Sequence, residues 1–233
     1  MIKEIIDKLV ALLAVSALLA SCSESELWQN PQTEARDGYI MLNFKTEIPA
    51  MQEVVTRAVD PDGGGVQDMT LFCFDSYGLF ISTVKAGVTV QKPGPGEMEG
   101  TFKAEVPENT RTIHFLANQN MDEFKEDSFR NKSESEVMAV LEGSSGRMIY
   151  WGRFACDAGN DSNIAEQMAT SGNSVKLIRN HARISVDNPD NNGHIVITGF
   201  AVCNTNAFGT VAPHHPKKGF DFTWFTRDPY FPF

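Results

Sequence analysis

The sequence has few cysteines and few basic residues, and both shortages limit what the protein can be. Its 233 residues include only four cysteines, and no two of them have the close spacing of a metal-binding pair. Lysine and arginine together number 20 against 30 acidic residues, which gives a net charge of −10. Nucleic-acid binding needs clustered basic side chains, so we expect no nucleic-acid partner. The same charge argues against electrostatic adsorption to anionic lipid.

The sequence also lacks the short motifs of common catalytic and cofactor sites. It contains no G-x-S-x-G, P-loop, H-E-x-x-H or dinucleotide fingerprint. The adjacent His214 and His215 could contribute to a metal site, but a closed site needs further ligands, and a polar loop is the better interpretation. We therefore expect no catalytic activity, no cofactor and no metal, and an exported hydrolase is the weakest alternative.

The apolar run near the amino terminus is too short for a membrane-spanning helix, which needs about 20 residues. It covers residues 9–20 and ends in Leu19-Ala20-Ser21-Cys22, with a small residue directly before a cysteine. A brief apolar core with small residues at its end predicts a secretory signal. A cysteine at the first mature position indicates a bacterial lipoprotein, cut between Ser21 and Cys22 and anchored by acyl chains on Cys22. An ordinary signal peptide, or a transmembrane helix followed by a chance cysteine, is the alternative.

If Cys22 is acylated, an odd number of cysteines remains, which cannot form a closed disulfide framework. These are Cys73, Cys156 and Cys203. Cys73 and Cys203 lie in apolar, strand-like runs, so we interpret both as buried small hydrophobes. The domain must then be held together by its hydrophobic core, which its length permits.

Two polar segments flank the first predicted strand, which covers residues 39–45. Residues 22–37 are acidic and aperiodic and indicate a flexible tether. On the other side, Arg57 and Ala58 precede a Pro-Asp-Gly-Gly-Gly turn signal and form an accessible cleavage site for an Arg-specific protease. Cutting there would free the first strand together with the lipid. Most exposed arginines are never processed, so an uncut linker is the alternative.

The remaining chain reads mainly as short strands with turn signals between them, which predicts an all-β sandwich. One helical region is predicted at 121–142, with a capping box from Ser133 to Glu136 and an apolar stripe of Val137, Val140 and Leu141. The polar stretch 158–173 is interpreted as a loop. The later strand candidates cover residues 66–75, 79–84, 100–106, 111–118, 147–156, 174–187 and 194–204.

Several of these stretches, taken together, resemble the fimbrillin family of fimbrial subunits. The resemblance covers about residues 19–212 and rests on the order and joint occurrence of its motifs. They are the lipoprotein signal Leu19-Ala20-Ser21-Cys22 (the lipobox), Thr56-Arg57-Ala58, Met69–Gly78, Gly100–Pro107, Thr112–Asn118 and Val175–Ile184.

The resemblance implies a transthyretin-like β-sandwich, carried to the cell surface as a lipoprotein and assembled into fimbriae by strand exchange. The helical region predicted at 121–142 would be one short helical insertion in this sandwich. An Arg-specific protease would cut between Arg57 and Ala58 and remove Tyr39–Lys45. A strand from another subunit would then fill the groove. The partners implied are other fimbrial subunits, the processing protease, and the outer membrane through lipid on Cys22.

This resemblance sets the expected domain organisation and function. Residues 1–21 are the signal peptide, 22–37 the tether, 38–212 the fimbrillin-like domain, and 213–233 a tail or the stub of a second sandwich domain that is typical of the family. The expected function is a structural or anchoring subunit of a surface fimbria with a role in adhesion. The alternative is a stand-alone surface lipoprotein that binds glycan or host protein, for which Trp151 and Trp224 could stack on sugars.

Overall fold

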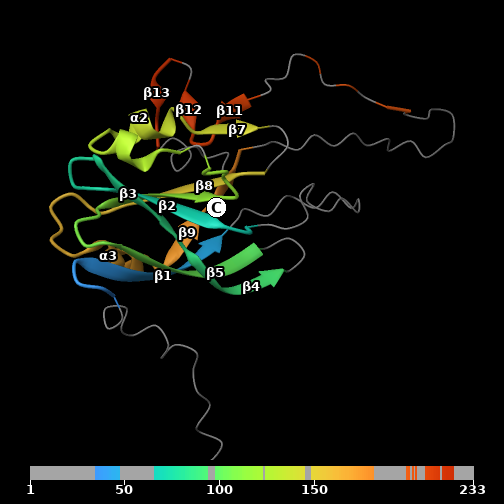
Figure 1. The fold of residues 1–233 in the computed structure, drawn as a ribbon. Coiled ribbons are helices and arrows are strands. Elements are labelled where there is room, and N and C mark those ends of the chain that lie inside the picture. The colour runs from blue at the N-terminus through green and yellow to red at the C-terminus, as the bar shows by residue number, and fades with distance from the viewer. Residues whose placement is uncertain are drawn as a thin grey trace, which may run out of the picture.

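The computed structural model describes residues 35–47, 66–93, 98–122, 124–144, 148–180, 198–199, 201, 203, 208–215 and 217–222. These residues form a β-sandwich whose five-stranded sheet lies between a four-stranded sheet and a cap of short elements (Figure 1). The predicted all-β sandwich is confirmed.

Both sheets are formed mainly by antiparallel pairs. The four-stranded sheet has the order β4 (Gly87–Pro93), β5 (Met98–Pro107), β1 (Tyr39–Glu47) and β9 (Ser174–Lys176). The five-stranded sheet has the order β10 (Ile178–Arg179), β8 (Tyr150–Ala155), β6 (Thr112–Ala117), β2 (Met69–Phe74) and β3 (Phe80–Lys85).

The main core fills the space between the two sheets. Strands β1 and β5 each bury every second residue, as the period of two predicts. The five-stranded sheet contributes the alternate residues of β2 and β6 to the same core. The inward residues of these four strands are Ile40, Leu42, Phe44, Phe102, Ala104, Val106, Met69, Leu71, Cys73, Ile113, Phe115 and Ala117.

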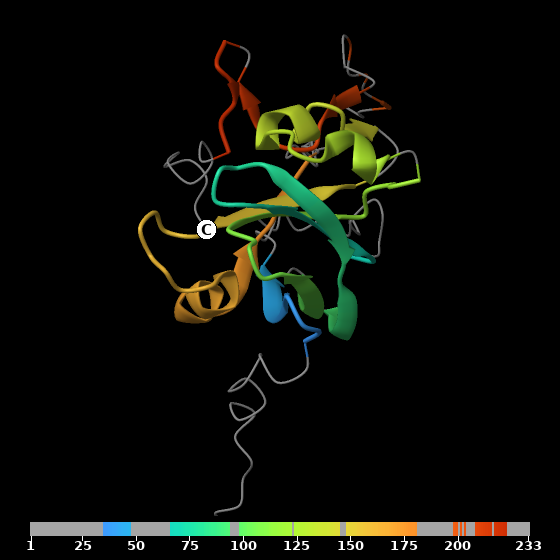
Figure 2. The ribbon, with the colours of Figure 1, turned by 60° about the vertical axis from the view of Figure 1, so that its left-hand side comes forward.

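The five-stranded sheet is also covered on its outer face, which explains why all six residues of β2 are buried. Phe72, Phe74 and Leu116 project into a second apolar cluster on that face. The covering elements lie together above the sheet in both views (Figures 1 and 2). They are η2 (Glu126–Phe129), α2 (Glu134–Met138), the β7–β11 pair (Glu142–Ser144 and Phe208–Thr210) and the β12–β13 hairpin (His214–His215 and Gly219–Phe220).

The edge strands of the two sheets are continuous with one another. Ala86 alone separates β3 from β4, and Leu177 alone separates β9 from β10, so the chain changes sheets at both points. Gly152 permits the second crossing, because a Cβ atom there would lie 2.7 Å from the Lys176 carbonyl oxygen. The prediction of one continuous strand over 174–187 is therefore wrong for its described part.

The helices differ from the prediction in length and number. The Ser133–Glu136 capping box is present, but α2 ends at Met138 and Val140 is 51% exposed, so the predicted stripe is only partly buried. The polar stretch interpreted as a loop contains α3 (Ile164–Thr170), which Asn163 caps together with Glu166. Figure 2 shows α3 beside β9 and β1, and it adds Ile164, Ala165 and Met168 to the main core.

Candidate functional site

The predicted processing residues fall outside the described part of the chain. Cys22, Arg57 and Ala58 are among the residues that the structure does not describe, and so is most of the predicted strand 194–204. The strand that processing would remove is described. It is β1, which extends two residues beyond the predicted Lys45, to Glu47.

Strand β1 lies inside the four-stranded sheet and has a neighbour on each side. Residues Tyr39–Thr46 pair antiparallel with β5, and Lys45–Glu47 pair parallel with β9. Both neighbours are tied to the five-stranded sheet, β5 through its pairing with β4 and β9 through β10. Without β1, β5 and β9 would be left as the two walls of a slot. This slot, bounded by β5 and β9 and floored by the core, is the candidate functional site.

The inward side of β1 fits the core closely. Phe44 is fully buried, its ring centroid lies 5.6 Å from that of Phe102 in a stacked arrangement, and the Phe115 ring meets it edge-on at 5.0 Å. Ile40 and Leu42 extend the same row along the strand. An occupant of the slot must therefore present hydrocarbon side chains at alternate positions.

An ion pair holds the amino-terminal end of β1. The Arg36 guanidinium donates from Nε to the Glu105 carboxylate at 2.7 Å, and the Arg36 backbone N–H donates to the same carboxylate at 2.6 Å. These contacts, the backbone hydrogen bond foremost, lower the pKa of Glu105. The guanidinium also stacks over the Tyr39 ring at 4.3 Å. The pair is exposed, so it positions the start of the strand and adds little stability.

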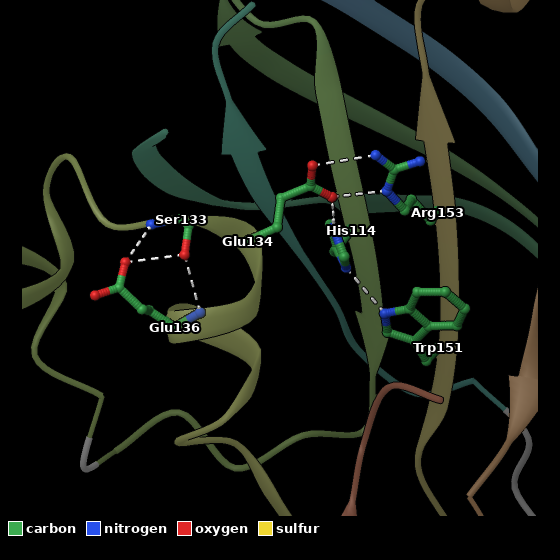
Figure 3. Close-up of polar contacts among 6 residues, drawn as sticks. All are labelled: His114, Ser133, Glu134, Glu136, Trp151 and Arg153. Atoms are coloured by element: carbon green, nitrogen blue, oxygen red, sulfur yellow. Dashed lines mark hydrogen bonds and ion pairs between the residues drawn. The ribbon is translucent and has the colours of Figure 1, made fainter. Parts of the chain in front are cut away.

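A second polar cluster lies on the opposite face of the five-stranded sheet (Figure 3). Glu134, the first residue of α2, accepts two hydrogen bonds from Arg153 of β8, at 2.7 and 3.1 Å. The same carboxylate lies 2.6 Å from Nε2 of His114 on β6. On the other side of the imidazole ring, the Trp151 indole N–H donates to Nδ1 at 3.1 Å. We call these four residues the His114 cluster.

The contacts assign His114 a neutral state and a single tautomer. Indole nitrogen only donates, so Nδ1 accepts and Nε2 carries the proton that it donates to Glu134. Complete burial lowers the pKa of His114, although Glu134 acts in the opposite direction. Both ring nitrogens are engaged and the side chain has no exposed surface. The cluster therefore fastens α2 to the sheet and is unsuited to proton transfer with a substrate.

The cysteines and histidines considered in the sequence can also be placed in the fold. Burial raises the pKa of the Cys73 thiol to about 12, in agreement with its interpretation as a buried hydrophobe. The same interpretation is wrong for Cys203, which is exposed and outside any strand. The interpretation of His214 and His215 as a polar loop is wrong, because they form β12, and the His214 ring meets Phe220 of β13 edge-on. Within the described residues, no three His, Cys, Asp or Glu side chains gather as metal ligands. No helix in the same residues is long and apolar enough to cross a bilayer.

Comparison with known proteins finds similar solved structures only at low identity. No family model matches the chain, and no curated protein matches it. A fimbrial assembly protein from Parabacteroides distasonis is 11% identical with a TM-score of 0.33, over 60% of this chain and 53% of that one. A candidate cell adhesion protein from Bacteroides eggerthii is 9% identical with a TM-score of 0.28, over 65% and 41%. The match thus spans about half the length of these proteins or less.

Proposed function

We propose that this chain is a structural or anchoring subunit of a cell-surface fimbria that assembles by strand exchange and contributes to adhesion. The observation that carries the proposal is the place of β1 in the middle of a sheet, between two neighbours that are held independently of it. The resemblance of the sequence to fimbrillins and its lipobox agree with this function. We propose no catalytic activity; among the described residues, the buried His114 has both ring nitrogens engaged in structural hydrogen bonds.

Strand exchange follows from the physical chemistry of the slot. Removing β1 would leave the facing backbone groups of β5 and β9 without partners and expose the apolar floor formed by Phe102 and Phe115. Unpaired strand edges and apolar grooves favour the addition of another strand. A strand supplied by a neighbouring subunit would restore both the backbone ladder and the core, and a series of such steps would build a fibre.

Lipidation and cleavage set the role of the subunit in this proposal. Acylated Cys22 would hold the precursor at the outer membrane. Cleavage between Arg57 and Ala58 would release residues 22–57 with the lipid and open the slot. A subunit that escapes cleavage would keep its lipid and remain at the base of the fimbria.

The cleavage step predicts the behaviour of an Arg57→Gln variant. Treatment of the mature wild-type chain with an Arg-specific protease is expected to yield a fragment beginning at Ala58 that forms polymers. The variant should keep residues 22–57 attached and stay monomeric, because β1 remains covalently linked. Amino-terminal sequencing detects the cleavage, and size-exclusion chromatography detects the formation of polymers. An Arg57→Lys variant, which keeps the charge, controls for electrostatic effects. A monomeric wild-type fragment beginning at Ala58 would overturn the assembly step.

The anchoring step predicts the behaviour of a Cys22→Ala variant. Without the thiol there is no acyl attachment, so the variant should move from the membrane fraction to the soluble fraction of cells. A Cys203→Ala variant, which removes an exposed thiol elsewhere, should fractionate like the wild type. Retention of the Cys22 variant in the membrane fraction would contradict lipid anchoring.

The structure weakens the alternative of a glycan-binding module. Trp151, one of the two tryptophans considered for sugar stacking, is 1% exposed and donates its indole N–H to His114. It is therefore part of the packed interior and unavailable to a sugar. Trp224, the other one, lies outside the described residues.

A further inference from the structure

One inward residue of β1 does not match its surroundings. Thr46 has no exposed surface, and its side-chain hydroxyl has no hydrogen-bond partner in the described part of the chain. A buried hydroxyl without a partner loses its hydrogen bonds to water and gains nothing in return. The other three inward residues, Ile40, Leu42 and Phe44, are hydrocarbons.

The position of Thr46 in the register explains the missing partner. It lies between Gly100 on β5 and Val175 on β9. The Phe102 ring leans over Gly100 so closely that a Cβ atom there would collide with the ring. Val175 is buried in the main core on the other side. The two register neighbours of Thr46, and the Phe102 ring over one of them, thus offer its hydroxyl only hydrocarbon side chains.

We propose that this end of the slot is a specificity pocket that selects a β-branched hydrocarbon, valine or isoleucine, in the strand that replaces β1. The pocket is defined by Gly100, Phe102 and Val175. Valine has the shape of threonine with a methyl group in place of the hydroxyl, so it fills the same volume without leaving a buried polar group unpaired. The partner is thus an extended segment of a neighbouring subunit with hydrocarbon side chains at four alternate positions, the last of them β-branched.

The pocket also accounts for the direction of the exchange. This inference rests on the proposed strand exchange and adds a reason for it to proceed. With Thr46, β1 completes the fold of the precursor, but it buries one hydroxyl group without a hydrogen-bond partner. An incoming strand that matches the pocket makes the same backbone hydrogen bonds. It binds more favourably because it does not bury an unpaired hydroxyl at the position of Thr46.

The test uses synthetic peptides and the full mature chain after cleavage by an Arg-specific protease. One peptide has the sequence of residues 37–47, a second carries Thr46→Val, and a third carries Lys45→Val. Lys45 is exposed, so the third peptide controls for added hydrophobicity and strand propensity outside the pocket. The Thr46→Val peptide is expected to bind about tenfold more tightly than the native sequence, and the Lys45→Val peptide should show no comparable gain.

A Thr46→Val variant of the uncut chain tests the pocket without any exchange. It should unfold at a higher denaturant concentration than the wild type, and after cleavage it should release β1 about tenfold more slowly. Equal binding of the three peptides, with no added stability in the variant, would overturn the selectivity and leave strand exchange intact. Binding of none of the peptides to the cleaved chain would overturn strand exchange, and the selectivity with it, whatever the stability of the variant.

Discussion

Replacing Phe44 with alanine is expected to lower the free energy of unfolding by about 3–5 kcal/mol, which is the usual effect of removing a buried phenylalanine. The Phe44 ring has no exposed surface and contacts both the Phe102 and Phe115 rings. Truncation removes both aromatic contacts and leaves a cavity in the core. Domains of this kind are stable by about 5–15 kcal/mol, so the loss is a large part of the total.

Equilibrium unfolding in urea measures this effect through the shift of the transition midpoint. Met41→Ala is the matched control, because Met41 belongs to the same strand, faces away from the core and is partly exposed. A Phe44 variant no less stable than the Met41 variant would mean that β1 is not packed into the core. The same measurement bears on function, since a loosely held β1 could be replaced without cleavage.

Replacing Glu134 with alanine is expected to lower the free energy of unfolding by about 3 kcal/mol at neutral pH, because removal of one partner leaves a largely buried charge uncompensated. Arg153 would lose both of its hydrogen bonds to Glu134, and His114 would lose the acceptor for its Nε2–H. Asp127→Asn is the matched control, since it breaks the exposed ion pair with Arg130. No measurable change is expected from that variant.

The dependence of this loss on pH identifies the carboxylate as its source. Hydrogen bonds from His114 and Arg153 outweigh desolvation and lower the pKa of Glu134 from 4.5 to about 2. The unfolded chain therefore binds the proton more readily, and the contribution of Glu134 is present above pH 4.5 and disappears as pH falls toward 2. The difference in stability between the wild type and Glu134→Ala should shrink over that range.

His114 adds an effect of the same sign at higher pH. Burial lowers its pKa below 6.5, so the unfolded chain takes up the proton first and the free energy of unfolding falls as pH drops below 6.5. Unfolding curves of the wild type between pH 7 and 3 should show a continuous loss of stability. A difference between wild type and Glu134→Ala that stays constant down to pH 3 would contradict an ionised Glu134 in the cluster.

Local patterns predicted most strands and their inward faces. The alternation Phe102, Ala104, Val106 in β5 and Ile113, Phe115, Ala117 in β6 is visible in the sequence, and the structure buries all six residues. The capping box at Ser133 likewise marked the start of α2. These signals succeed because each depends on residues close in sequence, where side-chain direction follows from strand or helix geometry alone.

The prediction failed where distant residues decide the structure. Helix α3 was missed although Asn163 and Glu166 have capping-box spacing, because its short apolar face becomes evident only against β1. The break at Leu177 follows from the close approach of Lys176 to Gly152, far away in sequence. The His114 cluster joins β6, α2 and β8, and the spacing of its members in the sequence does not predict that they are in contact.

The sequence by itself predicted a strand over residues 39–45 with Ile40, Leu42 and Phe44 on one face, because alternation along a strand is a local property. Only the tertiary structure decided where that strand lies. Its place between β5 and β9, in a slot whose walls are held by other strands, results from pairings with residues more than 50 positions away. The same long-range pairing buried Thr46 among hydrocarbons, and so turned an ordinary strand residue into the candidate determinant of partner choice.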